Sequence, residues 1–175
     1  MANTYVAIAT VTVGSGGTSY IEFTSIPATY TDLLIKTSLR SNRADGTVID
    51  TVQLRFNGNS SASYDMRRLT GTGAAATSGS GSGDISLPLD NPPSNSATAS
   101  TFGNSEYYIP NYAGSINKSV GADAVSENNG STAYARLTAG LWSNASAITS
   151  IRLTPDTGTL WVQHSTATLY GIKNT

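Results

Sequence analysis

The chain has no cysteine and a single histidine, His164. Without cysteine there is no disulfide framework and no thiol chemistry. One histidine excludes a structural zinc site and leaves a serine–histidine–aspartate triad only one possible base. No Gly-x-Ser-x-Gly segment is present to display a nucleophilic serine, and the polar neighbours of His164 predict a surface position on a strand.

Charge is also scarce, since only 12% of the residues are charged and the net charge is −1. Arg67 and Arg68 are the only adjacent basic pair, so the clustered cations that bind nucleic acid are missing. No apolar run reaches the ~18 residues of a membrane span. The N-terminal segment MANTYVAIATVTV alternates with threonine and lacks a charged start, so we expect neither a signal peptide nor a membrane span.

Small hydroxyl side chains replace the missing charge. The chain has 24 serines and 24 threonines, or 48 of 175 residues, and 17 glycines. Threonine suits pleated strands, whereas serine and glycine suit turns. The composition therefore predicts an all-β protein.

Alternating segments recur along nearly the whole chain, and SIPATYTDLLIKTSLRS (25–41) is the most informative. Its period of two predicts a half-buried strand, with Leu33, Ile35 and Leu39 toward the core and Lys36 and Arg40 outward. Further strands are expected within 5–13, 18–24, 51–56, 131–142, 148–153, 159–164 and 167–172, with 148–164 forming a hairpin around a Pro-led turn. About ten short antiparallel strands fit a β-sandwich or jelly roll without substantial helix, and a closed barrel is the alternative.

Two segments break the alternation, and we predict that both are flexible loops of a single domain spanning 1–175. Residues 71–84 (GTGAAATSGSGSGD) are of low complexity, and residues 90–100 (DNPPSNSATAS) contain the adjacent Pro92 and Pro93. Long loops in compact domains are often functional or disordered. They are either arms that become ordered on a neighbour or mobile solvent loops.

The segment SEYYIPNY (105–112) gathers Tyr107, Tyr108 and Tyr112 around a proline. Adjacent strand residues point to opposite faces, so one of Tyr107 and Tyr108 is expected outside the core. An exposed tyrosine offers stiff contact area to a protein partner or to a sugar ring. The alternative interpretation is that these tyrosines pack in the core.

The eleven carboxylates are scattered, and several lie beside turn residues, where Asp accepts backbone hydrogen bonds. No calcium-loop pattern is present, although Asp45 and Asp50 could flank a weak site. No metal ligand set and no cofactor motif is recognised.

Several segments together resemble a group of small virion proteins of tailed bacteriophages, of the marine and cyanophage type. They are SIPATYTDLLIKTSLRS, VQLRFNGNSSASY, TFGNSEYYIPNYAGS, GLWSNASAITSIRL and the terminal ATLYGI. The resemblance covers nearly the whole chain and implies a jelly-roll-like sandwich, often trimeric, that decorates or cements the capsid or belongs to the tail. It implies no catalytic residues.

The expected function is therefore that of a non-enzymatic capsid decoration (cement) protein on the virion surface, assembled in the bacterial cytoplasm. Its expected partners are the major capsid protein and further copies of itself, as a trimer, with no nucleic acid, membrane or cofactor. The predicted contact residues are Tyr107, Tyr108, Tyr112, Trp142, Pro92 and Pro93. One alternative is a tail-associated receptor- or carbohydrate-binding module, and a glycan hydrolase with two facing carboxylates is another.

Overall fold

The computed structural model describes residues 4–128 and 133–173, which contain twelve strands and no helix. The described residues therefore contain no helix long and apolar enough to cross a membrane. The strands are β1 (Tyr5–Thr12), β2 (Ile21–Phe23), β3 (Asp32–Leu39), β4 (Val52–Phe56), β5 (Tyr64–Gly71), β6 (Ala76–Asp84), β7 (Leu87–Pro88), β8 (Gly103–Ile109), β9 (Lys118–Ser126), β10 (Tyr134–Trp142), β11 (Ile151–Pro155) and β12 (Thr166–Ile172).

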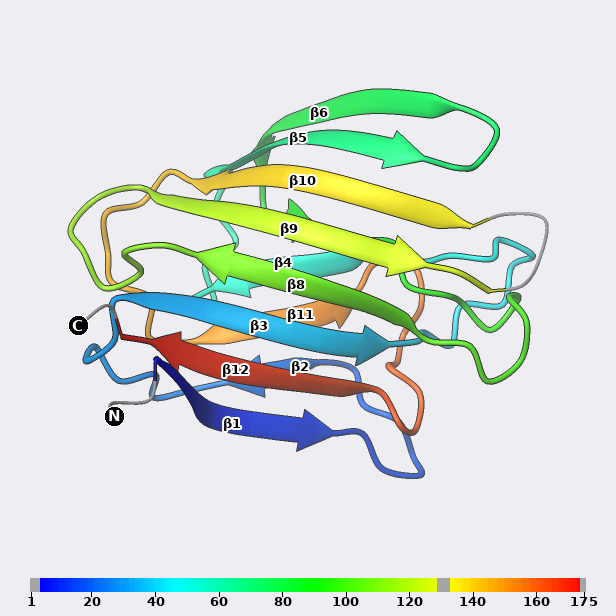
Figure 1. The fold of residues 1–175 in the computed structure, drawn as a ribbon, viewed down its shortest axis with the longest axis horizontal. Coiled ribbons are helices and arrows are strands. Elements are labelled where there is room, and N and C mark those ends of the chain that lie inside the picture. Colours follow the sequence, from blue (N-terminus) through cyan, green and yellow to red (C-terminus); the bar gives the residue numbers. More distant parts are fainter. Residues whose placement is uncertain (1–3, 129–132, 174–175) are drawn as a thin grey trace.

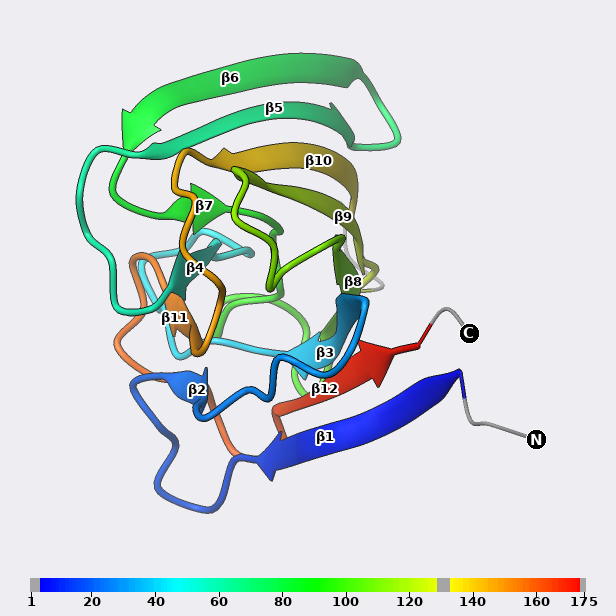
Figure 2. The same cartoon turned by 90° about the vertical axis from the view of Figure 1, so that its left-hand side faces the viewer.

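The strands form two antiparallel sheets that pack into a sandwich (Figures 1 and 2). The large sheet has the order β1-β12-β3-β8-β9-β10-β5-β6, and the small sheet has the order β2-β11-β4-β7. Four nested antiparallel pairs, β1–β12, β2–β11, β3–β8 and β4–β7, give the strand order of a jelly roll. The predicted all-β, jelly-roll-like sandwich is confirmed.

Two hairpins enlarge the basic eight-stranded jelly roll. β5 and β6 are inserted between β4 and β7, and β9 and β10 are inserted between β8 and β11. Both hairpins join the large sheet beyond β8, so that it continues to β6 at the top of Figure 1. Figure 2 shows the small sheet against one side of the large sheet. The opposite side, called here the outer face, is covered by no strand in the described part of the chain.

The core lies between the two sheets and follows the period-two pattern. In β4, Val52, Leu54 and Phe56 are fully buried. In β3, Leu33, Ile35 and Leu39 are also fully buried, as the sequence predicts. Burying a large aliphatic side chain contributes about 1.5–3 kcal/mol, so this shared face supplies the main driving force for pairing the sheets.

Residues 71–84 are not one flexible loop, and this prediction is wrong, since only the turn at residues 72–75 lies outside strands. Residues 76–84 form β6, which pairs with β5 from Gly71↔Ala76 to Met66↔Gly81. The segment is short of hydrophobic side chains because β6 lies at the edge of the sheet and buries little. Backbone hydrogen bonds to β5, not apolar burial, hold it as a strand.

The segment 90–100 does leave regular structure, but it is anchored to the sandwich, contrary to the predicted flexible loop. Pro92 and Pro93 are buried, and their carbonyls accept hydrogen bonds from Asp50 N and Ser41 N. The guanidinium of Arg40, predicted to point into solvent, is 5% exposed and donates to the carbonyls of residues 97, 98 and 101. Sequence spacing places Arg40 on the outward side but cannot show that a distant segment covers it.

Two further strand predictions need correction. The regular alternation expected for 5–13 is broken by a bulge between Ala7 and Ala9, so that both Ile8 and Val11 pack against the core. Residues 159–164 do not pair with β11 as a hairpin, because the segment instead bridges Trp161 to Thr18 and Ser41. His164 is exposed, as expected, but it occupies a turn with a φ of 73°.

Candidate interaction surface

The six residues predicted to contact a partner separate into one exposed and five buried. Tyr107, Tyr112 and Trp142 are at most 1% exposed and belong to the core, and Pro92 and Pro93 are buried within the 90–100 segment. The hydroxyl of Tyr112 donates to the carbonyl of Pro27. Only Tyr108 offers its ring to solvent, so the structure provides free contact area at this one predicted position.

Tyr108 lies on the outer face, where its side chain is 42% exposed. Its hydroxyl donates to Oδ2 of the buried Asp32 at 2.8 Å, while Oδ1 of Asp32 accepts from Asn111 N at 2.9 Å. The hydrogen bond to Asp32 raises the pKa of Tyr108, with a smaller contribution from burial. The ring is thereby held in one orientation with its face available.

A hollow of about 580 Å³ opens on the outer face over β3, β8, β9, β10 and β5. Two rows of paired residues cross these strands, one running Leu69–Leu137–Asp123–Glu106–Lys36 and the next Arg67–Ala139–Gly121–Tyr108–Leu34. A Cβ at Gly121 would meet no atom within 4 Å. The small residues Gly121 and Ala139 therefore leave the space between Arg67 and Tyr108.

The hollow combines apolar walls with a pair of facing carboxylates. Leu69 and Leu137 face each other and are more than half exposed. Glu106 is directly opposite Asp123 on the neighbouring strand and forms an ion pair with Lys36, whose Nζ lies 2.6 Å from Oε1. The hydrogen bond that Lys36 donates to Glu106 raises the pKa of Lys36. Like charges on adjacent strands repel, so this arrangement favours a ligand or partner that supplies hydrogen-bond donors.

The exposed leucine of β10 follows from an unusual orientation of this strand. Its polar side is buried, with Arg136 and Thr138 at most 5% exposed, whereas Leu137 is 55% exposed. The guanidinium of Arg136 donates to the carbonyl of Pro88 at 2.8 Å and to Oδ1 of Asn91 at 2.6 Å. Since the 88–91 segment satisfies the buried arginine, the apolar side of β10 faces solvent. The alternation of residues along β10 does not indicate which of its two sides faces solvent.

A buried carboxylate lies next to Arg136. Asp90 is 1% exposed, and its Oδ2 accepts hydrogen bonds from Ser105 and Tyr107, while Oδ1 has no partner among the described residues. Burial raises the pKa of Asp90 despite these hydrogen bonds and the nearby Arg136. Burial also lowers the pKa of Arg136 to about 10, with help from Arg68. This cluster is enclosed between the sheets, so it acts in folding rather than in contact with a partner.

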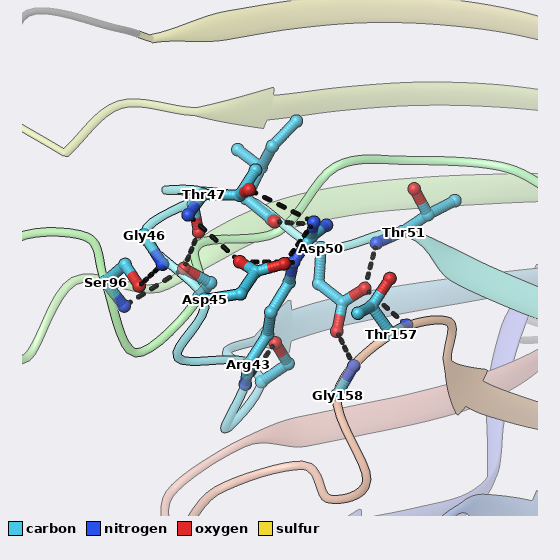
Figure 3. A network of polar contacts seen from close by, with 12 residues as sticks. Arg43, Asp45, Gly46, Thr47, Asp50, Thr51, Ser96, Thr157 and Gly158 are labelled. Atoms are coloured by element: carbon cyan, nitrogen blue, oxygen red, sulfur yellow. Dashed lines mark hydrogen bonds and ion pairs between the residues drawn. The ribbon is translucent and has the colours of Figure 1, made fainter.

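The loop carboxylates fulfil the turn role that the sequence predicts (Figure 3). Asp45 accepts hydrogen bonds from Arg43 Nε and Nη2 and from Thr47 N, and the Arg43 hydrogen bond holds its pKa well below the usual range. Asp50 is 1% exposed and accepts from the backbone N–H groups of residues 51, 157 and 158 at 2.8–3.0 Å. Protein donors already engage both carboxylates, which disfavours the weak calcium site suggested by their spacing.

Replacing Asp50 by alanine is expected to lower the free energy of unfolding by about 2–3 kcal/mol, because three partly buried N–H donors lose the buried carboxylate that accepts from them. Urea denaturation followed by circular dichroism measures the change. The matched control is Asp156→Ala, which removes an exposed carboxylate with one hydrogen bond from Gln53, and it should stay within about 0.5 kcal/mol of the parent. Equal losses in the two variants would contradict the anchoring role of Asp50.

No group of three or more metal-ligating side chains occurs within residues 4–128 and 133–173. Comparison with known proteins found no matching family model, curated protein or solved structure. Fold and surface together thus define the class of this chain: an all-β jelly-roll sandwich whose large sheet is extended by two inserted hairpins and has a partly apolar outer face.

Proposed function

We propose that this chain is a non-enzymatic structural protein of a tailed-bacteriophage virion, a decoration protein that binds the major capsid protein as a homo-oligomer. The observation that supports this proposal is the exposed apolar surface of the outer face. Five large apolar side chains, Tyr5, Leu69, Tyr108, Val125 and Leu137, are each more than 40% exposed there. Leu69 and Leu137 are directly paired on neighbouring strands, and contiguous exposed apolar surface of this kind usually marks a site of protein contact.

The fold agrees with this proposal as an analogy only. Jelly rolls occur in viral capsid proteins, but also in lectins and cupins, so the architecture alone does not select a function. The two inserted hairpins add specific support, because they extend the sheet and contribute Leu69 and Leu137 to the outer face. The capsid as the binding partner and the trimer as the oligomeric state are inferred from the resemblance to phage virion proteins.

The facing carboxylates of Glu106 and Asp123 would be the starting point for a glycan hydrolase. A general acid of that kind needs a pKa raised by an apolar, water-poor environment. Both side chains are exposed, and Glu106 is paired with Lys36. This setting favours a binding surface over hydrolysis.

The proposed mechanism is adhesion through several modest contacts. Each outer face presents a leucine pair and an oriented tyrosine to a capsid subunit, with Arg67, Lys36 and Asp123 as polar surroundings. Linking several copies makes each later contact intramolecular and raises the overall affinity by about 10²–10⁴ without any new contact. The sandwich therefore needs only moderate affinity per copy.

The test measures binding of the purified chain to capsids that lack it, by co-sedimentation and by cryo-EM of the decorated shells. Leu137→Asp should weaken binding roughly tenfold or more, because it places a further carboxylate beside Asp123 at the centre of an apolar contact. Ile85→Asp is the matched control, since Ile85 is similarly exposed but lies away from the outer face. Absent binding of the parent chain, or equal binding of both variants, would refute the proposal.

A carbohydrate-binding module of the tail is the second candidate, and the hollow itself favours it. The oriented Tyr108 ring can stack on a sugar, and Glu106 and Asp123 can accept hydrogen bonds from its hydroxyl groups. Glycan-array binding that is lost in Tyr108→Ala and kept in Tyr108→Phe would support this candidate. Capsid binding without any glycan signal would exclude it.

A further inference from the structure

The two sheets have four edge strands, and three of them are poorly suited to pair with another chain. β2 and β7 have three and two residues. β1 is interrupted by the bulge between Ala7 and Ala9. Short edges and bulges are the devices by which sheet proteins avoid edge-to-edge association.

β6 is the exception. It is nine residues long, and within the described chain it pairs only with β5 (Figures 1 and 2). Its own irregularity lies near its end, between Gly81 and Asp84, so the pairing over residues 76–81 is unbroken. Residues 76–83 contain no proline and no charged side chain. The edge that points away from β5 therefore carries backbone N–H and C=O groups that are open to another strand.

The glycines of β6 are explained by its own hairpin. A Cβ at Gly79 would lie 2.8 Å from Nε of Arg68, and one at Gly81 would clash with Oδ2 of Asp84. The side chains of Arg68 and Asp84 thus cover the inner side of β6. Neither of these two side chains belongs to residues 76–83, which form the free edge. The serines that alternate with the glycines of β6, Ser78, Ser80 and Ser82, are exposed on the outer face.

We propose that β6 pairs antiparallel with β6 of a second copy, around a two-fold axis perpendicular to the sheet near Gly79. The two eight-stranded sheets then become one continuous sheet. A two-fold axis at this point places Gly79 opposite Gly79 and Ser78 opposite Ser80 of the second copy, so each face stays uniform. Residues 76–83 offer a charged partner no countercharge, whereas an identical strand matches their exposed serines; the nearby charge is the guanidinium of Arg68, which lies over Gly79 on the inner side.

This inference deepens the proposed function by naming the element that joins the copies, and it makes a dimer, not a trimer, the unit. Both outer faces of such a dimer point to the same side. Two copies of the Tyr108 and Leu137 surface would therefore meet one capsid lattice together, which is the geometry that multivalent adhesion requires.

Light scattering during size-exclusion chromatography tests the dimer, with an expected mass of about 36 kDa, twice the 18.1 kDa of the chain. Ser80→Lys adds a charge at the edge and should weaken dimerisation more than about tenfold. The matched control is Thr12→Lys, the same kind of change on the exposed β1 edge, which should leave the dimer intact. A monomeric parent, an unaffected Ser80→Lys dimer, or dissociation caused only by Thr12→Lys would overturn the proposal.

Cysteine cross-linking reports on the same contact with a positive signal, since the parent chain has no cysteine. Oxidation of an equal mixture of Ser78→Cys and Ser80→Cys should form a covalent dimer faster than Ser119→Cys, which is exposed in the middle of the sheet. Cross-linking no faster than this control would overturn β6 pairing. A dimer that does not bind capsids would refute the decoration function and leave β6 pairing intact. A monomer that binds capsids would refute β6 pairing and leave the decoration function intact.

Discussion

Replacing Trp142 by alanine is expected to lower the free energy of unfolding by about 3–5 kcal/mol. Trp142 is 1% exposed and packs between Phe56 and Tyr64, with ring centroids 5.3 and 6.1 Å away. These three rings join β10, β4 and β5, so they connect the inserted strands to the small sheet. Truncation removes the ring and leaves a cavity that the surrounding strands cannot close.

Urea denaturation monitored by circular dichroism and by the fluorescence of Trp161 measures this loss. Trp142→Phe is the control and should cost clearly less, because the indole N–H of Trp142 has no acceptor in the described residues and a smaller aromatic ring still fills most of the space. The sequence alone suggests Trp142 as a contact residue. A stable Trp142→Ala variant with weakened capsid binding would restore that role and contradict the core role.

Replacing Arg136 by alanine is expected to lower the free energy of unfolding by about 3–5 kcal/mol near neutral pH, since it leaves a buried carboxylate without its countercharge. The guanidinium also satisfies the carbonyl of Pro88 and the side chain of Asn91, which lose their donor. Arg152→Ala is the matched control. Its partly exposed ion pair with Glu22 should contribute at most about 1 kcal/mol.

The loss caused by Arg136→Ala should depend on pH, with a sign set by Asp90. Burial raises the folded-state pKa of Asp90, so the folded chain binds this proton more tightly than the unfolded chain. Stability from this group is therefore present at low pH and is lost as the pH rises through the folded pKa. Removing Arg136 raises that pKa further, and the deficit should be largest above it and shrink on acidification toward the unfolded value of about 3.9.

Stability curves of the parent and Arg136→Ala, measured from pH 4 to pH 8, give this dependence directly. Adding Asp90→Asn to Arg136→Ala should recover part of the stability at neutral pH and flatten the curve, because an amide has no proton to exchange. A deficit that is constant with pH, or no recovery in the double variant, would show that Asp90 is not the group that needs Arg136.

Much of the sandwich is predictable from local pattern. The alternation in 51–56 and 33–39 predicts strands with the correct buried side, because side-chain direction in a strand depends only on residue parity. The same rule correctly separates the two sides of β10 and places Tyr107 and Tyr108 on opposite faces. The composition, rich in serine, threonine and glycine, predicts the all-β class without substantial helix.

The candidate surface is less predictable, because each of its features depends on residues distant in sequence. Arg40 is buried by the 97–101 carbonyls, and Leu137 is exposed because the 88–91 segment satisfies Arg136 on the opposite side of β10. Parity shows that Leu137 and Arg136 lie on different faces, but not which face the second sheet covers. The interface prediction for Trp142 fails for the same reason.

The sequence by itself determined that this chain folds into antiparallel strands, since period-two alternation and turn residues act locally. Only the tertiary structure decided that residues 76–84 form an open edge strand and that Tyr108, Leu69 and Leu137 share a hollow. Strand partners are chosen by hydrogen bonds and packing across long loops, and the energy of those contacts exists only once the sheets are assembled. A low-complexity segment such as β6 becomes a strand because β5 pairs with it, not because its own side chains require it.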